Sequence, residues 1–118
     1  MAGNRSVRLV LLAAFTVSIS TVWAQQGPVP DLLVQENATV KLAAHTYVIP
    51  DGNVSLVPNV GIVVGDRATL VIDPGLGRFN GETVLREVAK ISENTELYVA
   101  STHFHAEHTT GYHAFPPD

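Results

Sequence analysis

The alternation of hydrophobic and polar positions after residue 39 predicts short strands. Residues 40–42, Val-Lys-Leu, follow the two-residue period of a strand. Residues 46–49, Thr-Tyr-Val-Ile, are β-branched or aromatic, and such residues are enriched in strands. Pro50-Asp51-Gly52 follows, a combination that is typical of turns. The pattern therefore predicts two strands and then a turn at Asp51 and Gly52.

Two apolar runs, at residues 60–64 and 68–72, come next and predict a hairpin. Gly65-Asp66-Arg67 separates them, which is the spacing of an antiparallel pair joined by a short glycine-containing loop. Both runs are almost continuously apolar, as in strands that are covered on both faces. We therefore expect a sheet that is buried inside a layered fold.

Residues 80–91 carry the period of a helix. Four apolar residues mark one face at helical spacing: Val84, Leu85, Val88 and Ile91. Asn80 is the predicted N-cap, Glu82 lies in the first turn and Lys90 in the last, as the helix dipole favours. A further strand is predicted at residues 97–100, so the sequence of elements indicates an α/β fold.

The N-terminus has the pattern of a targeting segment. Two arginines precede an apolar run at residues 9–19, and Ala24 offers a small residue for cleavage, which is typical of a signal peptide over residues 1–24. An uncleaved membrane anchor is the alternative, but the run is shorter than the roughly 20 apolar residues that a spanning helix needs. We therefore expect a secreted or periplasmic protein without a stable membrane span. Residues 25–39 hold two closely spaced prolines near their start and are predicted to form a flexible leader.

Composition and charge narrow the class of protein. The chain has 118 residues, of which 46% are hydrophobic and 15% charged, as expected of one small globular domain. The formal net charge is -4 and the basic residues form no runs, so we expect no nucleic-acid partner. There is no cysteine, so neither a disulfide framework nor a thiolate metal site can form.

A cluster of histidines follows the last predicted strand, as His103-x-His105-x-Glu107-His108. Alternate side chains of an extended segment point the same way, so His103 and His105 can bind one ion while Glu107 and His108 face a neighbouring position. Imidazoles with a carboxylate and no thiolate suit zinc best, although iron and manganese also fit these ligands. A solvated polar loop is the alternative, but three histidines and an acid at this spacing favour a metal site.

The same residues carry a resemblance to a known family. Thr-His-Phe-His-Ala-Glu-His at residues 102–108, followed by Gly111, resembles the signature of the metallo-β-lactamase superfamily, T-H-x-H-x-D-H followed shortly by glycine. The hairpin and the segment Val-Ile-Asp-Pro-Gly at residues 71–75 are also similar to the N-terminal half of that family, so the resemblance covers roughly residues 40–115. It implies the N-terminal half of a four-layer αββα sandwich, and we expect a partial domain of this kind over residues 40–118.

The resemblance also implies roles for the motif. In the superfamily the first two histidines bind one metal ion, the acid and third histidine bind a second, and a bridging hydroxide attacks an ester-like centre. These roles fall on His103 and His105, then on Glu107 and His108, with one or two zinc ions. The candidate catalytic residues are Glu107 and Asp73. Glu107 stands where the superfamily usually has aspartate, and this variant resembles secreted zinc metallohydrolases.

The superfamily's remaining ligands lie far downstream of the motif, whereas this chain ends at Asp118. Two histidines leave a zinc ion short of the three protein ligands of catalytic sites. We therefore expect a truncated hydrolase of small molecules, whose activity in this form is in question. Half of a sandwich would also leave one sheet face uncovered, through which copies could self-associate. The alternatives are a non-catalytic metal-binding or interaction module and a di-iron redox protein on the same fold.

Other polar residues have less specific interpretations. The resemblance places Asp73 near the metal, where such an aspartate orients the ligand loop, but Asp-Pro-Gly at residues 73–75 is also a common turn. Both interpretations stay open. His45 and His113 lie outside the motif, and we expect packed or exposed histidines there rather than ligands.

Overall fold

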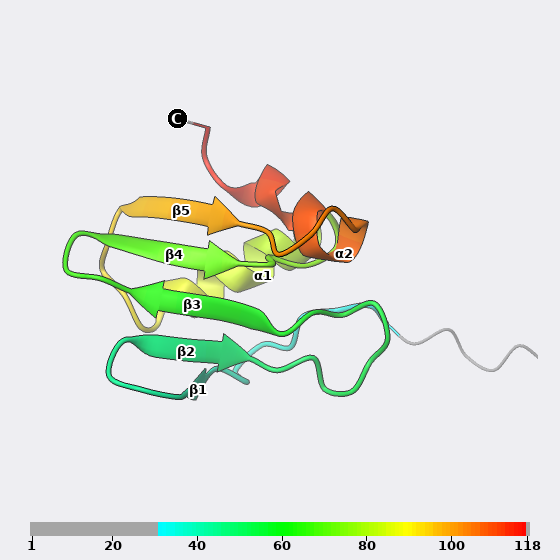
Figure 1. Cartoon of the computed structure of the whole chain (residues 1–118), viewed down its shortest axis with the longest axis horizontal. Coiled ribbons are helices and arrows are strands. Elements are labelled where there is room, and N and C mark those ends of the chain that lie inside the picture. Colours follow the sequence, from blue (N-terminus) through cyan, green and yellow to red (C-terminus); the bar gives the residue numbers. More distant parts are fainter. Residues whose placement is uncertain (1–30, 118) are drawn as a thin grey trace, which may run out of the picture.

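Five strands form one mixed sheet whose order in space follows the sequence (Figure 1). The structure is a computed structural model that describes residues 31–117, so the expected signal peptide and residues 25–30 of the leader lie outside the described residues. The strands are β1 (Val40–Lys41), β2 (Thr46–Ile49), β3 (Val60–Val64), β4 (Ala68–Ile72) and β5 (Glu96–Ala100). The first four pair antiparallel, and β5 pairs parallel to β4 after the helix α1 (Gly77–Ala89). The α/β class expected from the sequence is therefore present.

The predicted strands agree closely with the observed ones. The predictions at residues 46–49, 60–64 and 68–72 are confirmed with the same bounds, and the strand predicted at 97–100 begins one residue earlier, at Glu96. The hairpin between β3 and β4 is also confirmed, and its loop closes when Gly65 donates its amide hydrogen to the carbonyl of Ala68 at 2.9 Å. These elements could be predicted because alternating hydrophobicity and turn residues are signals that involve only a few neighbouring positions.

The start of α1 differs from the expectation. The helix begins at Gly77, after Leu76 at the N-cap position, so the prediction of Asn80 as N-cap and of Glu82 in the first turn is wrong. Gly75 and Gly77 adopt positive φ values of 92° and 72°, which glycine tolerates and which turn the chain from β4 into the helix sooner. Asn80 instead lies within the helix and is buried.

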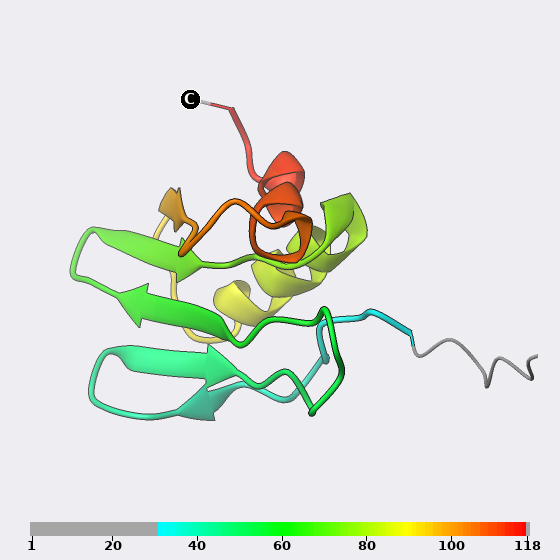
Figure 2. The same cartoon turned by 45° about the vertical axis from the view of Figure 1, so that its right-hand side comes forward.

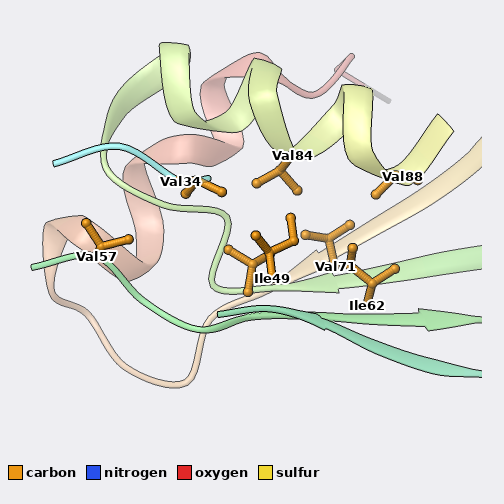
Figure 3. Packing of buried hydrophobic residues seen from close by; sticks show 8 residues of the cluster. Val34, Ile49, Val57, Ile62, Val71, Val84 and Val88 are labelled. Atoms are coloured by element: carbon orange, nitrogen blue, oxygen red, sulfur yellow. The ribbon is translucent and has the colours of Figure 1, made fainter. Parts of the chain in front are cut away.

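One face of the sheet packs against α1 (Figure 2). Figure 3 shows side chains from the strands and the helix meeting between the two layers. The core consists of eight buried apolar residues: Val34, Ile49, Val57, Val60, Ile62, Val71, Val84 and Val88. Side chains alternate across each strand, so the residues between these core positions point to the opposite face.

No element within residues 31–117 covers that opposite face. Val63 in β3 is 36% exposed and Tyr98 in β5 is 56% exposed. The apolar runs of β3 and β4 led us to expect a sheet covered on both faces, and the described part of the chain supplies a helical layer on one face only.

Residues 31–39 have no regular secondary structure, yet they lie against α1. Val34 is buried and donates its backbone amide hydrogen to the side-chain oxygen of Asn80 at 2.9 Å. The Glu87 carboxylate, also buried, accepts hydrogen bonds from the amide of Asn37 at 2.9 Å and from the hydroxyl of Thr39 at 2.6 Å. The described part of the segment expected to be a flexible leader is thus bound to the helix by polar contacts that the local sequence does not reveal.

Two short helices complete the chain, α2 (Ala106–Thr109) and the 3-10 helix η1 (Thr110–Ala114). Both contact α1 beyond the ends of β4 and β5 (Figure 1). Within residues 31–117, no helix is both long enough and apolar enough to cross a membrane.

Candidate metal centre

The histidine cluster leaves the sheet where β4 and β5 end side by side. Parallel neighbours end at the same edge of a sheet, so the residues after each strand meet. The amide of Asp73, just after β4, donates a hydrogen bond to the carbonyl of Ala100, the last residue of β5, at 2.9 Å. The residues that follow β5, from Ser101 onward, therefore begin the histidine loop directly beside Asp73.

Asp73 holds the first turn of that loop. Its carboxylate, 5% exposed, accepts hydrogen bonds from the amide and from the hydroxyl of Thr102, both at 2.8 Å. Burial alone would raise the pKa of the Asp73 carboxyl, but the bonds from Thr102 and the nearby His108 ring together lower that pKa below its ordinary value. Asp73 is therefore a buried carboxylate that stays ionised. Its φ of 58° also makes it the turn residue that the sequence allowed.

His108 approaches the same carboxylate from α2. Its Nδ1 lies 2.9 Å from Oδ2 of Asp73, close enough for an ion pair whenever the ring is protonated. This contact with His108 is among those that lower the pKa of the Asp73 carboxyl. A carboxylate at one ring nitrogen orients a histidine and leaves its other ring nitrogen for a metal ion.

The three motif histidines lie together. The ring centroid of His103 is 4.0 Å from that of His108 and 4.6 Å from that of His105. Nδ1 of His105 lies 3.7 Å from Oε1 of Glu107, in the first turn of α2. His103 and His105 are exposed, whereas Glu107 and His108 are half-buried. The structure thus places the four candidate ligands in one loop and one short helix, beside Asp73.

These donors fit a metal by their chemistry, although the rings have not converged on a single point. Within the described ranges, no group of three or more histidine, aspartate or glutamate side chains is arranged to hold an ion as it stands. His103 and His105 are exposed, so little packing opposes rotation of their rings. Imidazole and carboxylate are ligands for zinc, and the contact of His108 Nδ1 with Asp73 leaves the other ring nitrogen of His108 as the donor for one.

The motif glycine has a packing role that the resemblance did not explain. A side-chain Cβ on Gly111 would lie 2.3 Å from the carbonyl oxygen of Pro74, and one on Gly81 would lie 2.0 Å from the carbonyl oxygen of Gly111. The amide of Gly111 also donates a hydrogen bond to the carbonyl of Gly75 at 2.8 Å. The two glycines let η1 contact both α1 and the turn after β4, and so hold the histidine loop in place.

Sequence reasoning missed the residue that joins this loop to the start of α1. The hydroxyl of Thr110 accepts a hydrogen bond from the amide of Gly77 and donates one to the carbonyl of Ala106, both at 2.7 Å. The cap of α1 therefore comes from a distant part of the chain rather than from the residue before the helix. A hydroxyl two residues after His108 was the only signal available, and it is not specific.

The two remaining histidines lie outside the cluster. His45 is exposed in the loop between β1 and β2, at the opposite end of the sheet from α2 (Figure 1). His113 is exposed in η1, where its ring stacks with Tyr112 at a centroid distance of 4.1 Å. Both residues lie outside the histidine loop, so they serve as natural controls for the cluster. Comparison with models of protein families and with curated proteins finds no match for this chain.

Proposed function

We propose that this protein is a secreted or periplasmic, zinc-dependent hydrolase of the metallo-β-lactamase superfamily, built on half of its four-layer αββα sandwich. The observation that carries the proposal is the gathering of His103, His105 and His108 beside the buried Asp73 carboxylate. Their ring centroids lie 4.0 and 4.6 Å apart, at the end of a parallel strand pair. The resemblance of residues 102–108 to the superfamily signature supports the same assignment.

Each residue has a proposed role. His103 and His105 would hold one metal ion through imidazole nitrogens, and His108 would hold a second together with the Glu107 carboxylate from the first turn of α2. Asp73 positions the loop through its two bonds to Thr102. When bound, zinc would lower the pKa of a coordinated water towards neutrality and polarise a carbonyl or phosphoryl oxygen of the substrate.

Substrate class is proposed only as a small molecule with an ester-like centre. Lactams, thioesters, lactones and phosphoesters all react by attack of an activated water, and a metal centre of this kind suits each of them.

A non-catalytic metal-binding module is the second candidate. The observation that favours it is the absence, within the described ranges, of any converged group of three metal-binding side chains. Catalytic zinc sites provide three protein ligands and an open position, so a loosely formed site would bind metal without activating water. A di-iron redox protein remains the third candidate, because imidazole and carboxylate ligands also suit iron.

Metal content is the first test. The purified protein is dialysed against trace zinc and its metal is measured by mass spectrometry, beside a His103→Ala/His105→Ala double variant. The matched control is His45→Ala/His113→Ala, which removes the same number of imidazoles outside the cluster. We expect near-stoichiometric zinc in the natural protein and the control, and a loss of at least tenfold in affinity in the cluster variant. Equal metal loss in both variants, or no metal in any, would sink the proposal.

Turnover separates the three candidates. Hydrolysis of a chromogenic lactam, a thioester, a lactone and a phosphoester is measured with the metal-loaded protein. The His103→Ala/His105→Ala variant is the negative control. Hydrolysis of one class that disappears in the variant supports the hydrolase. Tight zinc binding without turnover supports the binding module, and retained iron with a redox signal supports the third candidate.

A further inference from the structure

The side chain of Asn80 joins residues 31–34 to the start of α1. Asn80 is 3% exposed, and its Oδ1 accepts a hydrogen bond from the amide of Val34 at 2.9 Å. Its Nδ2 donates to the carbonyl of Leu32 at 2.8 Å and to the carbonyl of Leu76, just before α1, at 2.9 Å. An asparagine amide has two donor hydrogens, so both have a partner here. One buried side chain therefore binds two segments that lie far apart in the sequence.

The turn between β4 and α1, residues 73–76, packs on this same contact. Gly75 in the turn has a φ of 92°, and a Cβ on it would lie 2.8 Å from Cβ of Asn80 and 3.0 Å from Cγ2 of Val34. Only glycine fits at such short distances, so the backbone of Gly75 lies against both side chains. Residues 31–34, Asn80 and the turn are thus parts of one packed unit.

The same turn fixes the histidine loop at two points. The Asp73 carboxylate accepts two hydrogen bonds of 2.8 Å from Thr102, and the carbonyl of Gly75 accepts one from the amide of Gly111 at 2.8 Å. Thr102 precedes the first motif histidine and Gly111 follows the last. A displacement of the turn would therefore move the anchors on both sides of the candidate ligands.

We propose that Asn80 is a positioning residue for the metal ligands, because it holds the turn after β4 against residues 31–34 and so sets the affinity for zinc. The inference rests on the proposed metal centre. The hydrogen bonds of Asn80 go to residues 32, 34 and 76, so Asn80 acts on the ligands through the turn. A loop whose anchors are already fixed loses less conformational freedom when it binds an ion, and therefore binds the ion more tightly. Coupling through a chain of packed residues is worth about a 3- to 30-fold change in affinity.

Glu87 offers a matched control at the other end of the same segment. It lies about two turns after Asn80 in α1, and its carboxylate accepts hydrogen bonds from the amide of Asn37 and the hydroxyl of Thr39. Glu87→Gln therefore loosens residues 37–39 on the helix without removing a bond to the turn. A variant that weakens only the docking of this segment is thus separated from one that releases the turn.

Hydrogen exchange of the metal-free protein measures directly how firmly the loop is held. In Asn80→Ala, we expect the amides of Thr102 and Gly111 to exchange about 3- to 30-fold faster, because the turn that accepts their hydrogen bonds is released. The amides shared between β3 and β4 report whether the rest of the fold is intact. In Glu87→Gln the amide of Asn37 should exchange faster instead, and the two loop amides should not change. Equal protection of the loop amides in the natural protein and in Asn80→Ala would contradict the proposal.

Zinc binding then shows whether the position of the loop matters for the site. The affinity is measured by competition with a chromogenic chelator, and cobalt in place of zinc gives absorption bands that report the ligand geometry. We expect Asn80→Ala to bind zinc about 3- to 30-fold more weakly and to shift the cobalt bands, and Glu87→Gln to do neither. An equal loss of affinity in the two variants would show that Asn80 acts only through stability. A natural protein that binds no zinc would overturn the proposed function, while the exchange of the loop amides still decides the role of Asn80.

The natural protein provides a further test if Asn80→Ala fails to fold. In low concentrations of denaturant, the amides of Val34 and Gly111 should open with the same free energy and the same dependence on denaturant, as parts of one unit. If the Gly111 amide stayed protected at a denaturant concentration where the Val34 amide exchanges freely, the two segments would be independent and the proposal would be wrong.

Discussion

Asp73 holds Thr102 through two hydrogen bonds of 2.8 Å, one to the backbone amide and one to the side-chain hydroxyl. The two residues follow β4 and β5, so this pair fixes the position at which the histidine loop leaves the sheet. Oδ2 of Asp73 also lies 2.9 Å from Nδ1 of His108, at the far end of the motif. One buried carboxylate thus contacts both ends of the loop that carries the candidate ligands.

Replacement of Asp73 by asparagine should loosen this loop. Asparagine tolerates the left-handed φ of 58° at this position, but the side-chain nitrogen that replaces one carboxylate oxygen cannot accept the bond from the Thr102 hydroxyl. We expect a loss of about 1–3 kcal/mol in the free energy of unfolding, measured by urea denaturation. We also expect metal affinity to fall by about 10- to 100-fold, because outer residues that orient ligands have effects of this size.

The control for this substitution is Asp51→Asn. Asp51 also accepts a backbone bond, from Asn53 at 2.9 Å, but in an exposed turn away from the loop. Its replacement should change stability by less than about 0.5 kcal/mol and leave metal binding unaltered. Equal effects of the two variants would show that Asp73 is only a turn residue.

The strands were predictable because their signals are local. The bounds of β2, β3 and β4 follow from apolar runs that end at turn residues. The same locality grouped the histidines, since His103, His105 and His108 lie within one loop and one turn of helix. A short segment cannot spread its side chains far, so closeness in sequence became closeness in space.

The contacts between distant segments could not be predicted. The start of α1 is set by Thr110, which caps the helix from a part of the chain that follows β5. Asn80 has the side chain of a good N-cap, but it binds Val34 and Leu32 from within the helix. Polar side chains of this kind have several possible partners, and the sequence alone does not say which partner the fold brings near.

The Glu87 carboxylate should make stability depend on pH. Burial alone would raise the pKa of Glu87, but hydrogen bonds from Lys90 and Thr39, with further help from Asn37, hold that pKa below its ordinary value. A carboxyl whose pKa is lower in the folded state stabilises the fold above its unfolded pKa, near 4.5. This stabilisation is lost as the pH falls through the lower, folded pKa.

Glu87→Gln therefore tests the contribution. We expect the variant to lose about 1–3 kcal/mol at pH 7, where the natural carboxylate is fully ionised. The difference should narrow as the pH falls below 4.5, measured by urea denaturation at each pH. Glu82→Gln is the control, because Glu82 forms only an exposed ion pair with Arg78, and it should change stability by less than about 0.5 kcal/mol. If the difference in unfolding free energy between the natural protein and Glu87→Gln did not change with pH, the lowered pKa of Glu87 would be contradicted.

Gly81 should not tolerate a side chain. A Cβ there would lie 2.0 Å from the carbonyl oxygen of Gly111 and 2.7 Å from the Cβ of Ala114, so η1 would have to move away from α1. We expect Gly81→Ala to cost at least about 1–3 kcal/mol despite the better helix propensity of alanine, measured by thermal denaturation. Gly65→Ala, in the hairpin loop with a contact of 3.1 Å, should cost less. A stabilised Gly81→Ala variant would show that η1 does not pack as described.

Asn80 should control whether residues 31–39 stay on the helix. Its side-chain oxygen accepts from the Val34 amide at 2.9 Å, and its amide group donates to the carbonyl of Leu32 at 2.8 Å. Asn80→Ala leaves both groups of that segment without partners, which we expect to cost about 1–3 kcal/mol in the free energy of unfolding. The amide of Val34 should then exchange faster with solvent, and protease should cut within residues 31–39 while the sheet remains intact. Asn59→Ala, which removes an exposed bond to Asp51, is the control and should leave the Val34 amide protected. If the Val34 amide stays protected from exchange in Asn80→Ala, then apolar packing of Val34 alone holds the segment, and the hydrogen bonds of Asn80 contribute little.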